Sequence, residues 1–449
     1  MTNKEMTNDA PSQKAHMEQQ PLSDEESITL QEQAVIRKVD WRLIPILGAL
    51  YSISLIDRVN ISSARIAGME KELRLDIGNR YSIALLVFFI PYLIFEGFIT
   101  NYASLIVCRL FVGFFESGFF PGCVYLISCW YARYEVQKRL AAFYLSAVLV
   151  GGFSGILAFG LMQLQGVRGY LGWRWIFIIE GLITQLIAIF SWFFIVDFPH
   201  NAQKTRFLTA QEADLVQLRI DKDRQDAGPD PLTIGKIGKH LCDWKLWMFS
   251  LMLMATTAPV YAFAFFSPVI IKSMGYSAGI SNLLIAPPYV FAVASAYVFA
   301  CFGDKWRMRG PIIVIQSLIS ITGLLLIAQH PNNDVRYFGL FIGIAGCQGN
   351  IPALLAHQSN NIRMQSKRAV GTALQVGFGA IGGIIGSTTF RQADAPRYVP
   401  GLWVSTGLLF VVIGLLGVTE WLLWKRNKEI DEGKAKEPIE GLQGFKYTL

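Results

Sequence analysis

The sequence carries little charge for its length. Asp, Glu, Lys and Arg make up only 16% of its 449 residues, whereas a soluble globular domain carries about 25%. Hydrophobic residues make up 53% of the chain. They form repeated runs of about 20 residues separated by short charged loops, which is the pattern of a polytopic helical membrane protein. We therefore interpret the net charge of +7 as a signal for orientation and for anionic lipid head groups, with no nucleic acid as a partner.

The motifs of several other protein classes are missing. The six cysteines contain no C-x-x-C pair and no zinc spacing, so we expect buried thiols rather than a structural disulfide or a metal site. The sequence contains no P-loop, which argues against ATP-driven transport. It also offers no nucleophile–base pairing and no cofactor loop, so we expect neither an enzyme nor a cofactor.

The N-terminal residues lack the features of a targeting segment. Residues 1–38 are polar and contain no apolar core with a cleavage site, so they are not a signal peptide. Their abundance of Gln, Glu and Ser predicts a disordered tail. We place this tail in the cytoplasm.

Eleven apolar runs predict eleven membrane-spanning helices, because an open strand cannot satisfy its backbone groups in lipid. The runs cover residues 43–64, 81–98, 102–131, 140–164, 174–197, 246–271, 281–302, 311–329, 337–357, 369–389 and 402–424. The predicted fold is therefore an all-α polytopic membrane protein. A central cytoplasmic loop (198–245) separates an N-terminal bundle of five spans (39–197) from a C-terminal bundle of six spans (246–424), and a cytoplasmic tail (425–449) follows.

The central loop carries the signature of one surface helix. Thr209 and Glu212 have the spacing of a capping box, and apolar residues follow them, so we expect a short helix there. A flexible stretch over residues 226–233 should come next. The loop as a whole would then act as a hinge between the two bundles.

Basic residues orient the second half of the chain but leave a conflict in the first half. The central loop, the 303–310 and 358–368 loops and the C-terminal tail are rich in Lys and Arg, which places them in the cytoplasm. Counting spans backwards from there puts the N-terminal tail outside the membrane. Arg37, Lys38 and Arg42 instead favour a cytoplasmic N-terminus, so the two criteria contradict each other.

Two pairs of opposite charges lie inside apolar runs. Asp57 and Arg58 lie in the first run, and Arg109 and Glu116 lie in the third. An unpaired ion near the middle of a bilayer costs several kcal/mol, so such residues are usually functional. Arg109 and Glu116 are seven residues apart and share a helical face, whereas Asp57 and Arg58 point about 100° apart. The four charges predict either a polar centre for substrate and proton or static salt bridges between helices.

Five stretches of the chain carry a family resemblance. They are KVDWRLIPILGALYSISLIDRVNISSARIAGMEKEL, YSIALLVFFIPYLIFE, CRLFVGFFESGFFPGCVYLISCWY, GWRWIFIIEGLIT and FPHNAQKTRFLTAQE. The chain resembles, from about Val39 to Lys425, the major facilitator superfamily and its anion:cation symporter branch, with the fungal allantoate- and nicotinate-type permeases. The resemblance implies twelve helices in two six-helix halves, with substrate bound between halves that rock.

The resemblance skips a segment between Glu96 and Gly97. The stretch that ends at Glu96 is similar to the family's second helix, and the stretch that begins at Gly97 is similar to the end of its third. The missing part is most of the third helix with the loop before it, about 30 residues when a span takes about 20. Its absence explains both the odd number of spans and the conflict over orientation. We hypothesise a splice variant, a gene-model error or a genuine deletion.

The resemblance also implies roles for the buried charges. Asp57 and Glu116 would carry protons. Arg58 and Arg109 would bind the anionic substrate, because a guanidinium grips a carboxylate with two parallel hydrogen bonds.

A charged loop after the seventh predicted span resembles the superfamily's cytoplasmic loop motif. Its residues are GDKWRMR, beginning at Gly303. The resemblance implies that Asp304 and Arg307 serve as a gate, in which Asp304 latches against the end of a neighbouring helix.

Four further polar residues in apolar runs are candidates for the cavity. Gln348, Asn350 and Gln375 would either line a substrate site or form hydrogen bonds between helices. Tyr92 would contact substrate or pack against other helices. We include Tyr92, Asn350 and Gln375 in the predicted substrate site.

Together these features predict a secondary transporter that moves a small organic anion with protons. The anion would be a monocarboxylate such as a nicotinate-, allantoate- or pantothenate-like compound. Its partners would be that anion, protons and membrane lipids, and we expect a monomer in the plasma membrane rather than in a vacuolar or other organelle membrane. The alternative is a non-transporting truncated isoform or a ligand-sensing membrane protein, which the missing segment favours.

Overall fold

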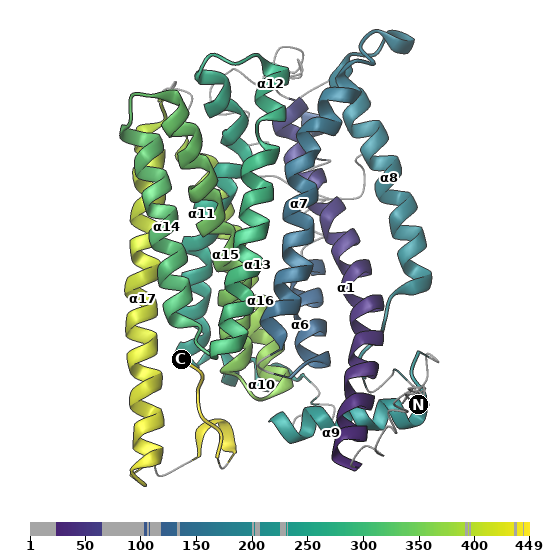
Figure 1. Cartoon of the computed structure of the whole chain (residues 1–449), viewed down its shortest axis with the longest axis vertical. Coiled ribbons are helices and arrows are strands. Elements are labelled where there is room, and N and C mark those ends of the chain that lie inside the picture. Colours follow the sequence, from purple (N-terminus) through teal and green to yellow (C-terminus); the bar gives the residue numbers. More distant parts are fainter. Residues whose placement is uncertain are drawn as a thin grey trace, which may run out of the picture.

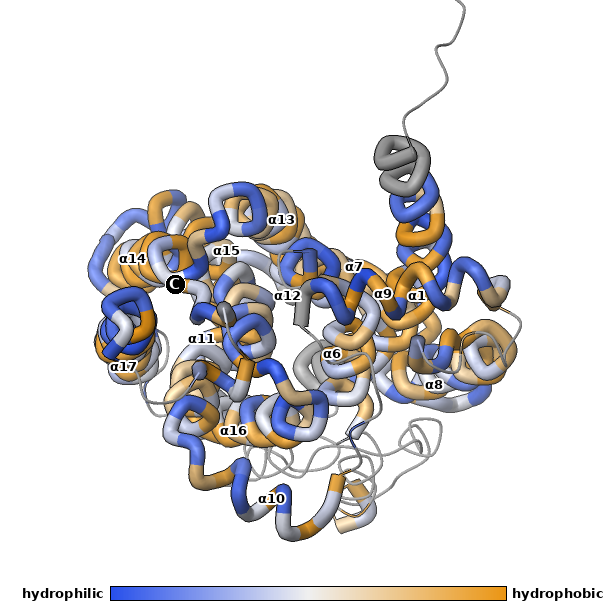
Figure 2. Tube along the Cα trace, turned by 90° about the horizontal axis from the view of Figure 1, so that it is seen from below, coloured by the Kyte–Doolittle hydropathy of each residue, from blue (hydrophilic) through white to orange (hydrophobic). Residues whose placement is uncertain are grey.

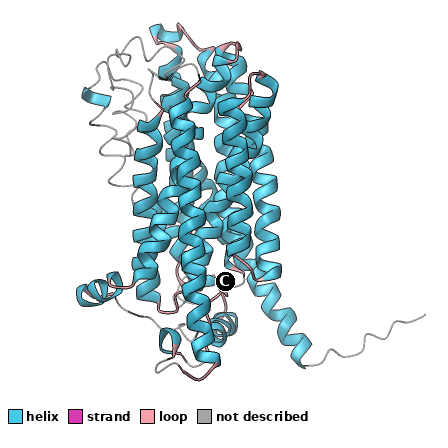
Figure 3. Cartoon of the chain, turned by 90° about the vertical axis from the view of Figure 1, so that its left-hand side faces the viewer, coloured by secondary structure: helices cyan, strands magenta, loops and turns pink. Residues whose placement is uncertain are grey.

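The computed structural model is a bundle of long helices that share one long axis (Figure 1). It describes residues 24–64, 103–105, 107, 118–132, 135–199, 202, 207–224, 230, 232–390, 394, 397–434, 438–442 and 444–449. Within these ranges the chain is helical and contains no strand (Figure 3). The prediction of an all-α membrane fold is therefore confirmed.

The long helices form two halves that lie side by side (Figure 1; Figure 2). The first half contains α1 (Asp24–Ala64), α6 (Phe119–Trp130), α7 (Val136–Met162) and α8 (Gly172–Phe194). The second half contains α11 (Trp244–Ser273), α13 (Ala286–Trp306), α14 (Gly310–Gln329), α15 (Asn333–Asn360), α16 (Gln365–Thr389) and α17 (Val399–Asp431).

Shorter elements connect the long helices. They are the 3-10 helices η2 (Val167–Gly169) and η5 (Ile439–Gly441) and the helices α9 (Ala210–Arg224), α10 (Ile234–Leu241) and α12 (Ala278–Leu283). In Figure 1, α9, α10 and the C-terminus lie at one end of the bundle, and α12 lies at the other. We call these the lower and the upper end.

Nine helices in the described residues are long and apolar enough to cross a membrane. They coincide with nine of the eleven predicted spans. The predicted span 81–98 lies outside the described residues, and only the second part of 102–131 is described, where α6 lies. The count of eleven is therefore not confirmed.

Helix α1 begins earlier than the sequence analysis expected. It starts at Asp24, whereas a disordered tail was expected through residue 38. Val35 and Ile36 are buried in one apolar cluster with Val216 of α9. Helix α1 packs against α9, which gives its start a tertiary partner that the polar composition of the tail did not reveal.

The capping box of the central loop is confirmed. The Thr209 N–H donates to Glu212 Oε2 at 2.8 Å, and the Glu212 N–H donates to Thr209 Oγ1 at 3.3 Å. Helix α9 follows as predicted. Helix α10, whose first turn is capped by Thr233, was not predicted from the sequence.

The structure decides the conflict over the N-terminal side. Lys38 Nζ of α1 lies 2.9 Å from Glu212 of α9, and Arg42 Nε donates to the carbonyl of Phe194 at the end of α8 at 3.4 Å. The start of α1 and the central loop therefore lie at the same end of the bundle. Arg37, Lys38 and Arg42 were therefore a better guide to the side of the N-terminal segment than the count of spans.

Helix α7 joins the two halves. It packs against α13 and α15, and two of its glycines allow the approach. A Cβ at Gly152 would lie 2.6 Å from Tyr289 Cβ, and one at Gly155 would lie 2.9 Å from the Asn282 carbonyl oxygen. Small residues at these positions let the helix backbones come close.

The C-terminal segment (438–442 and 444–449) folds back onto the lower end of the second half (Figure 1). Asn427 of α17 and Tyr447 exchange two hydrogen bonds of 2.9 Å. Asn361, just after α15, accepts from the Thr448 N–H at 2.8 Å and donates to the Thr448 carbonyl at 3.1 Å. Side-chain amides thus satisfy the backbone of this segment, which fixes its position beneath α15 and α17.

Candidate functional site

A cavity of about 540 Å³ lies between the two halves. Its size falls within the range of about 300–1,000 Å³ found for small-molecule sites. Helices α1, α6 and α7 form one wall, and α11, α13, α15 and α16 form the other. The lining residues with an aromatic ring or a polar side chain are Tyr51, Phe120, Tyr144, Ser154, Thr257, Tyr261, Phe265, Tyr289 and Gln348. None of the cavity's described lining residues is charged.

Both walls carry aromatic rings. In the first half, Tyr51 lies 4.7 Å from Phe120 between ring centroids and 5.1 Å from Phe143. In the second half, Tyr261 and Phe265 stack at 5.8 Å. These residues come from α1, α6, α7 and α11, and none of them was named as a site residue from the sequence. The regular spacing of aromatics in apolar helices is equally typical of core packing, so the sequence carried no signal that could single them out.

One hydrogen bond crosses the cavity from half to half. The Tyr144 hydroxyl of α7 donates to Gln348 Oε1 of α15 at 2.6 Å, and both residues are buried. Among the amides considered from the sequence, Gln348 is the one that lines the cavity.

Asn350 and Gln375, which the sequence placed in the substrate site, form bonds between helices instead of lining this cavity. Asn350 Nδ2 donates to Ser317 Oγ of α14 at 2.9 Å, and Gln375 Nε2 donates to the Leu354 carbonyl of α15 at 3.3 Å. Gln348 and Asn350 are two positions apart, about 200° around a helix. One of them must therefore face away when the other faces the cavity.

Asp57 is buried and points toward α8. The Thr184 hydroxyl oxygen of α8 lies 3.3 Å from Asp57 Oδ2 and 3.4 Å from Oδ1. Glu180, one helical turn before Thr184, is buried as well. The interface of α1 and α8 therefore holds two carboxyl groups beside the cavity wall rather than in it.

Position 58 lies on a different face of α1. It follows Tyr51 by seven residues in the same helix, which is the spacing of one helical face, and Tyr51 lines the cavity. The side chain of Arg58 lies outside the described residues, as do Tyr92, Arg109 and Glu116.

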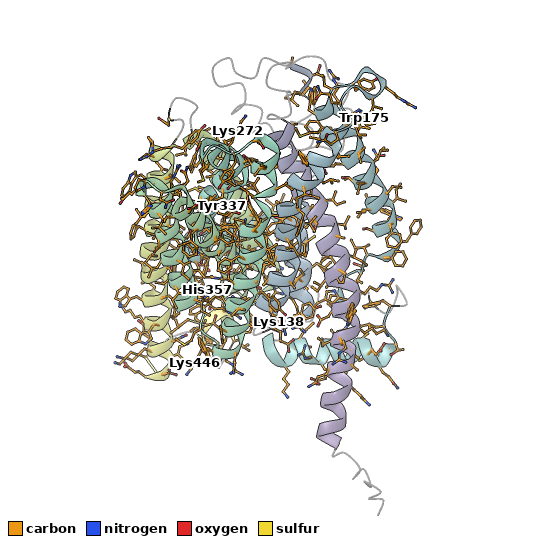
Figure 4. The ribbon with its side chains drawn as sticks, turned by 45° about the horizontal axis from the view of Figure 1, so that its top comes forward. Lys138, Trp175, Lys272, Tyr337, His357 and Lys446 are labelled. Atoms are coloured by element: carbon orange, nitrogen blue, oxygen red, sulfur yellow. The ribbon has the colours of Figure 1, made fainter. Side chains whose placement is uncertain are left out.

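The predicted gate residue Asp304 lies at the lower end, at the junction of the halves. Its Oδ2 accepts from the backbone N–H of Lys138 in the first turn of α7 at 2.9 Å, and its Oδ1 accepts from Arg309 at 2.8 Å. Figure 4 shows Lys138 at this end of the first half. A carboxylate is favoured there by the partial positive charge of a helix N-terminus.

Arg309, and not Arg307, is the arginine that holds Asp304. The Arg309 side chain is fully buried, whereas Arg307 is exposed and ends α13 in the left-handed conformation with φ 56°. The two arginines are alternate residues of one short loop, so nothing in the local sequence indicates which of them turns inward.

A further polar contact lies within the second half. His357 Nε2 of α15 lies 2.9 Å from Glu420 Oε1 of α17, although their angle does not meet that of a hydrogen bond. Phe249 of α11 packs edge-on against the His357 ring at 5.0 Å. Figure 4 shows His357 in the lower part of this half, away from the upper-end residues Lys272 and Tyr337.

Comparisons with known proteins agree with this architecture. The family model of the Major Facilitator Superfamily matches residues 80–387. The transporter hxnP of Emericella nidulans is 29% identical over 90% of this chain and 88% of its own length. The high-affinity nicotinic acid transporter of Saccharomyces cerevisiae is 28% identical over 90% of this chain and 80% of its own length.

A solved structure shares the fold. It is a bacterial homolog of the human lysosomal transporter Spinster, in an inward-facing and occupied conformation. It is 15% identical, covers 85% of this chain and 97% of its own, and has a TM-score of 0.56.

The relatives contain positions that this chain lacks. The match to the nicotinic acid transporter runs over 436 positions. It includes 90% of this 449-residue chain, or about 404 residues, so about 32 positions hold no residue of this chain.

Proposed function

Because this chain belongs to the Major Facilitator Superfamily and is a multi-pass membrane transporter of that family, we propose that it couples the movement of a small organic anion to that of a proton. The observation that carries the proposal is the central cavity, whose walls come from both halves. A site shared by two halves is opened to one side or the other when the halves rock, which is alternating access.

The anion would be held by arginine. Position 58 lies on the face of α1 that carries Tyr51, and we assign Arg58 and Arg109 to the substrate carboxylate, with Tyr92 as a further contact. The described cavity walls are aromatic and neutral, so a cation from the remaining residues is what an anion there would require. The nicotinic acid transporter among the relatives supports a monocarboxylate as substrate.

The proton would be carried by carboxyl groups next to the cavity. Asp57 is buried beside it, with Thr184 as a hydroxyl partner. We assign Asp57 and Glu116 to proton transfer. Arrival of the anion would neutralise a neighbouring arginine and change the free energy of protonating these carboxyl groups, which couples the two events.

The lower end would be held shut by Asp304. Its contact with the Lys138 N–H joins the second half to the first, so this bond must break before the cavity can open toward α9 and α10. We place this lower end in the cytoplasm, because it carries the basic central loop and the C-terminal tail. The plasma membrane is the proposed location.

Uptake into vesicles tests the proposed function. Purified protein would be reconstituted, and uptake of labelled nicotinate would be measured at acidic and at neutral external pH. We expect faster uptake at acidic pH and loss of this pH dependence in Asp57→Asn. The matched control is Asp334→Asn, an exposed carboxyl group at the start of α15. Uptake that is equal at both pH values in the unmodified chain would reject proton coupling.

A second candidate function is ligand binding without transport. The absence of about 32 aligned positions favours it, because most of one helix would be missing from the first half. The test is a chain with the relative's segment inserted between Glu96 and Gly97. Transport by that longer chain, together with binding but no transport by this one, would establish the second candidate.

A further inference from the structure

The amide of Gln348 offers unused donors to the cavity. Its Oε1 accepts from Tyr144 at 2.6 Å, which leaves the two N–H groups of Nε2 as donors at the other arm of the amide. No described residue accepts a hydrogen bond from Nε2, and Gln348 lines the cavity. Since a buried polar group without a partner is costly, these donors are suited to an acceptor atom of a bound molecule.

Aromatic rings line the cavity around this amide. Tyr51 and Phe120 face the cavity from the first half, and Tyr261 and Tyr289 face it from the second. Aromatic rings prefer offset-stacked or edge-to-face neighbours at about 4.5–7 Å. The cavity therefore offers ring faces and edges on both sides to an aromatic ligand. An aliphatic ligand would be stabilised by the burial of its apolar surface alone.

Two glycines keep space open beside these rings. A Cβ at Gly151 of α7 or at Gly377 of α16 would meet no atom within 4 Å, and both glycines line the cavity. The close-packed glycines of the bundle differ from these two: a Cβ at Gly152 would collide with Tyr289. Gly151 and Gly377 thus border open space, which a ring of a bound molecule can occupy.

We propose that the cavity binds a planar aromatic acid whose ring carries a hydrogen-bond acceptor, and that Gln348 is the residue that selects for this acceptor. The inference rests on the proposed function, in which arginine holds the carboxylate. Here the ring lies between the tyrosines of the two halves, and Gln348 Nε2 donates to the ring acceptor.

The position of Gln348 also links the ligand to both halves. Tyr144 belongs to the first half and Gln348 to the second, and one hydrogen bond joins them. A ligand that accepts from Nε2 orients the amide and so keeps Oε1 aimed at the Tyr144 hydroxyl. Binding of the correct ring therefore strengthens a contact between the halves.

Equilibrium binding to the purified full chain tests the inference without requiring transport. Three labelled acids would be compared: nicotinate, which has a ring nitrogen acceptor; benzoate, which has the same flat ring without it; and cyclohexanecarboxylate, which is not flat. We expect nicotinate to bind about tenfold more tightly than benzoate, the worth of one hydrogen bond. Benzoate should bind more tightly than cyclohexanecarboxylate.

The decisive variant is Gln348→Leu. It should lower the affinity for nicotinate to that for benzoate and leave benzoate within about twofold, since a leucine still fills the position. Retained binding of benzoate shows that the variant is folded. The matched control is Gln329→Leu, at the exposed end of α14, which should keep the preference for nicotinate.

The outcomes separate the inference from the proposed function. Equal binding of all three acids, or a preference for nicotinate that persists in Gln348→Leu, would overturn the inference while leaving an anion transporter in place. If none of the three acids binds to the unmodified chain, the anion site itself is refuted, and the inference is refuted with it.

Discussion

Replacing Glu440 with Gln should release the C-terminal segment from the second half. The Glu440 side chain is only 4% exposed and contacts Lys245 Nζ, and its Oε1 lies 2.8 Å from Lys367 Nζ. Lys367 also lies 2.5 Å from Asp243. One carboxylate of the C-terminal segment thus neutralises two lysines, one on α11 and one on α16.

The size of the effect follows from this arrangement. Removal of one partner from a buried ion pair costs about 3–5 kcal/mol, because the other charge is left uncompensated. Asp243 remains beside both lysines, so part of the compensation survives. We therefore expect Glu440→Gln to destabilise the docked segment by about 2 kcal/mol, which is about a 30-fold change in its opening equilibrium.

The effect should depend on pH with a definite sign. Although burial raises the pKa of Glu440, the charges of Lys245 and Lys367 outweigh it and hold the pKa below the ordinary 4.5. For Asp243 too, the same two lysines outweigh burial and hold the pKa below 3.8. A carboxyl group with a lowered pKa stabilises the docked state above its ordinary pKa, and the stabilisation is lost as the pH falls through the lowered value. The difference between the unmodified chain and Glu440→Gln should be full at neutral pH and shrink below about pH 4.5.

Hydrogen exchange of the backbone amides measures this opening. The N–H groups of Tyr447 and Thr448 are bonded to side-chain amides of the second half, and their exchange should become about 30-fold faster in Glu440→Gln. The control is Glu429→Gln, whose partner Arg426 is 43% exposed, and it should change exchange less than about twofold. Equal protection in Glu440→Gln and in the unmodified chain would refute the reasoning.

Three other substitutions test the site and the lower end. Arg109→Ala should weaken binding of labelled nicotinate by about 10- to 100-fold, because it removes a charge-assisted hydrogen bond to the substrate. The amount of protein in the membrane fraction should not change. Normal binding would mean that Arg109 is structural. Asp304→Asn should loosen the junction of the halves and expose the buried Cys129, whose Sγ lies 3.9 Å from Arg368 of the second half. Maleimide labelling of Cys129 should become about fivefold faster, which corresponds to a loss of about 1 kcal/mol. An unchanged labelling rate would show that Asp304 does not hold the lower end closed. Thr209→Ala removes the cap of α9 and should destabilise the start of this helix by about 1 kcal/mol. Hydrogen exchange of the backbone amides should become about fivefold faster in the first turn of α9 alone. Slower or equal exchange would contradict the capping role.

The sequence by itself determined the class of the protein and the long apolar helices that the structure describes. Long apolar runs must become helices in lipid, because only a helix satisfies every backbone group within its own segment. The capping box of Thr209 and Glu212 was equally readable, since a local hydrogen-bond pattern needs no distant partner. Asp304 was also predicted correctly to lie against a neighbouring helix, although that prediction came from the resemblance of its loop to a family motif.

The tertiary structure alone decided which side chains face the cavity. Periodicity fixes the angle between two residues of one helix, but the rotation of the whole helix about its axis is set by the neighbours against which it packs. Asp57 faces α8 and Gln348 faces the cavity for this reason, and neither direction is written in the local sequence. The aromatic walls, drawn from helices far apart in the chain, exist only because the two halves are packed together.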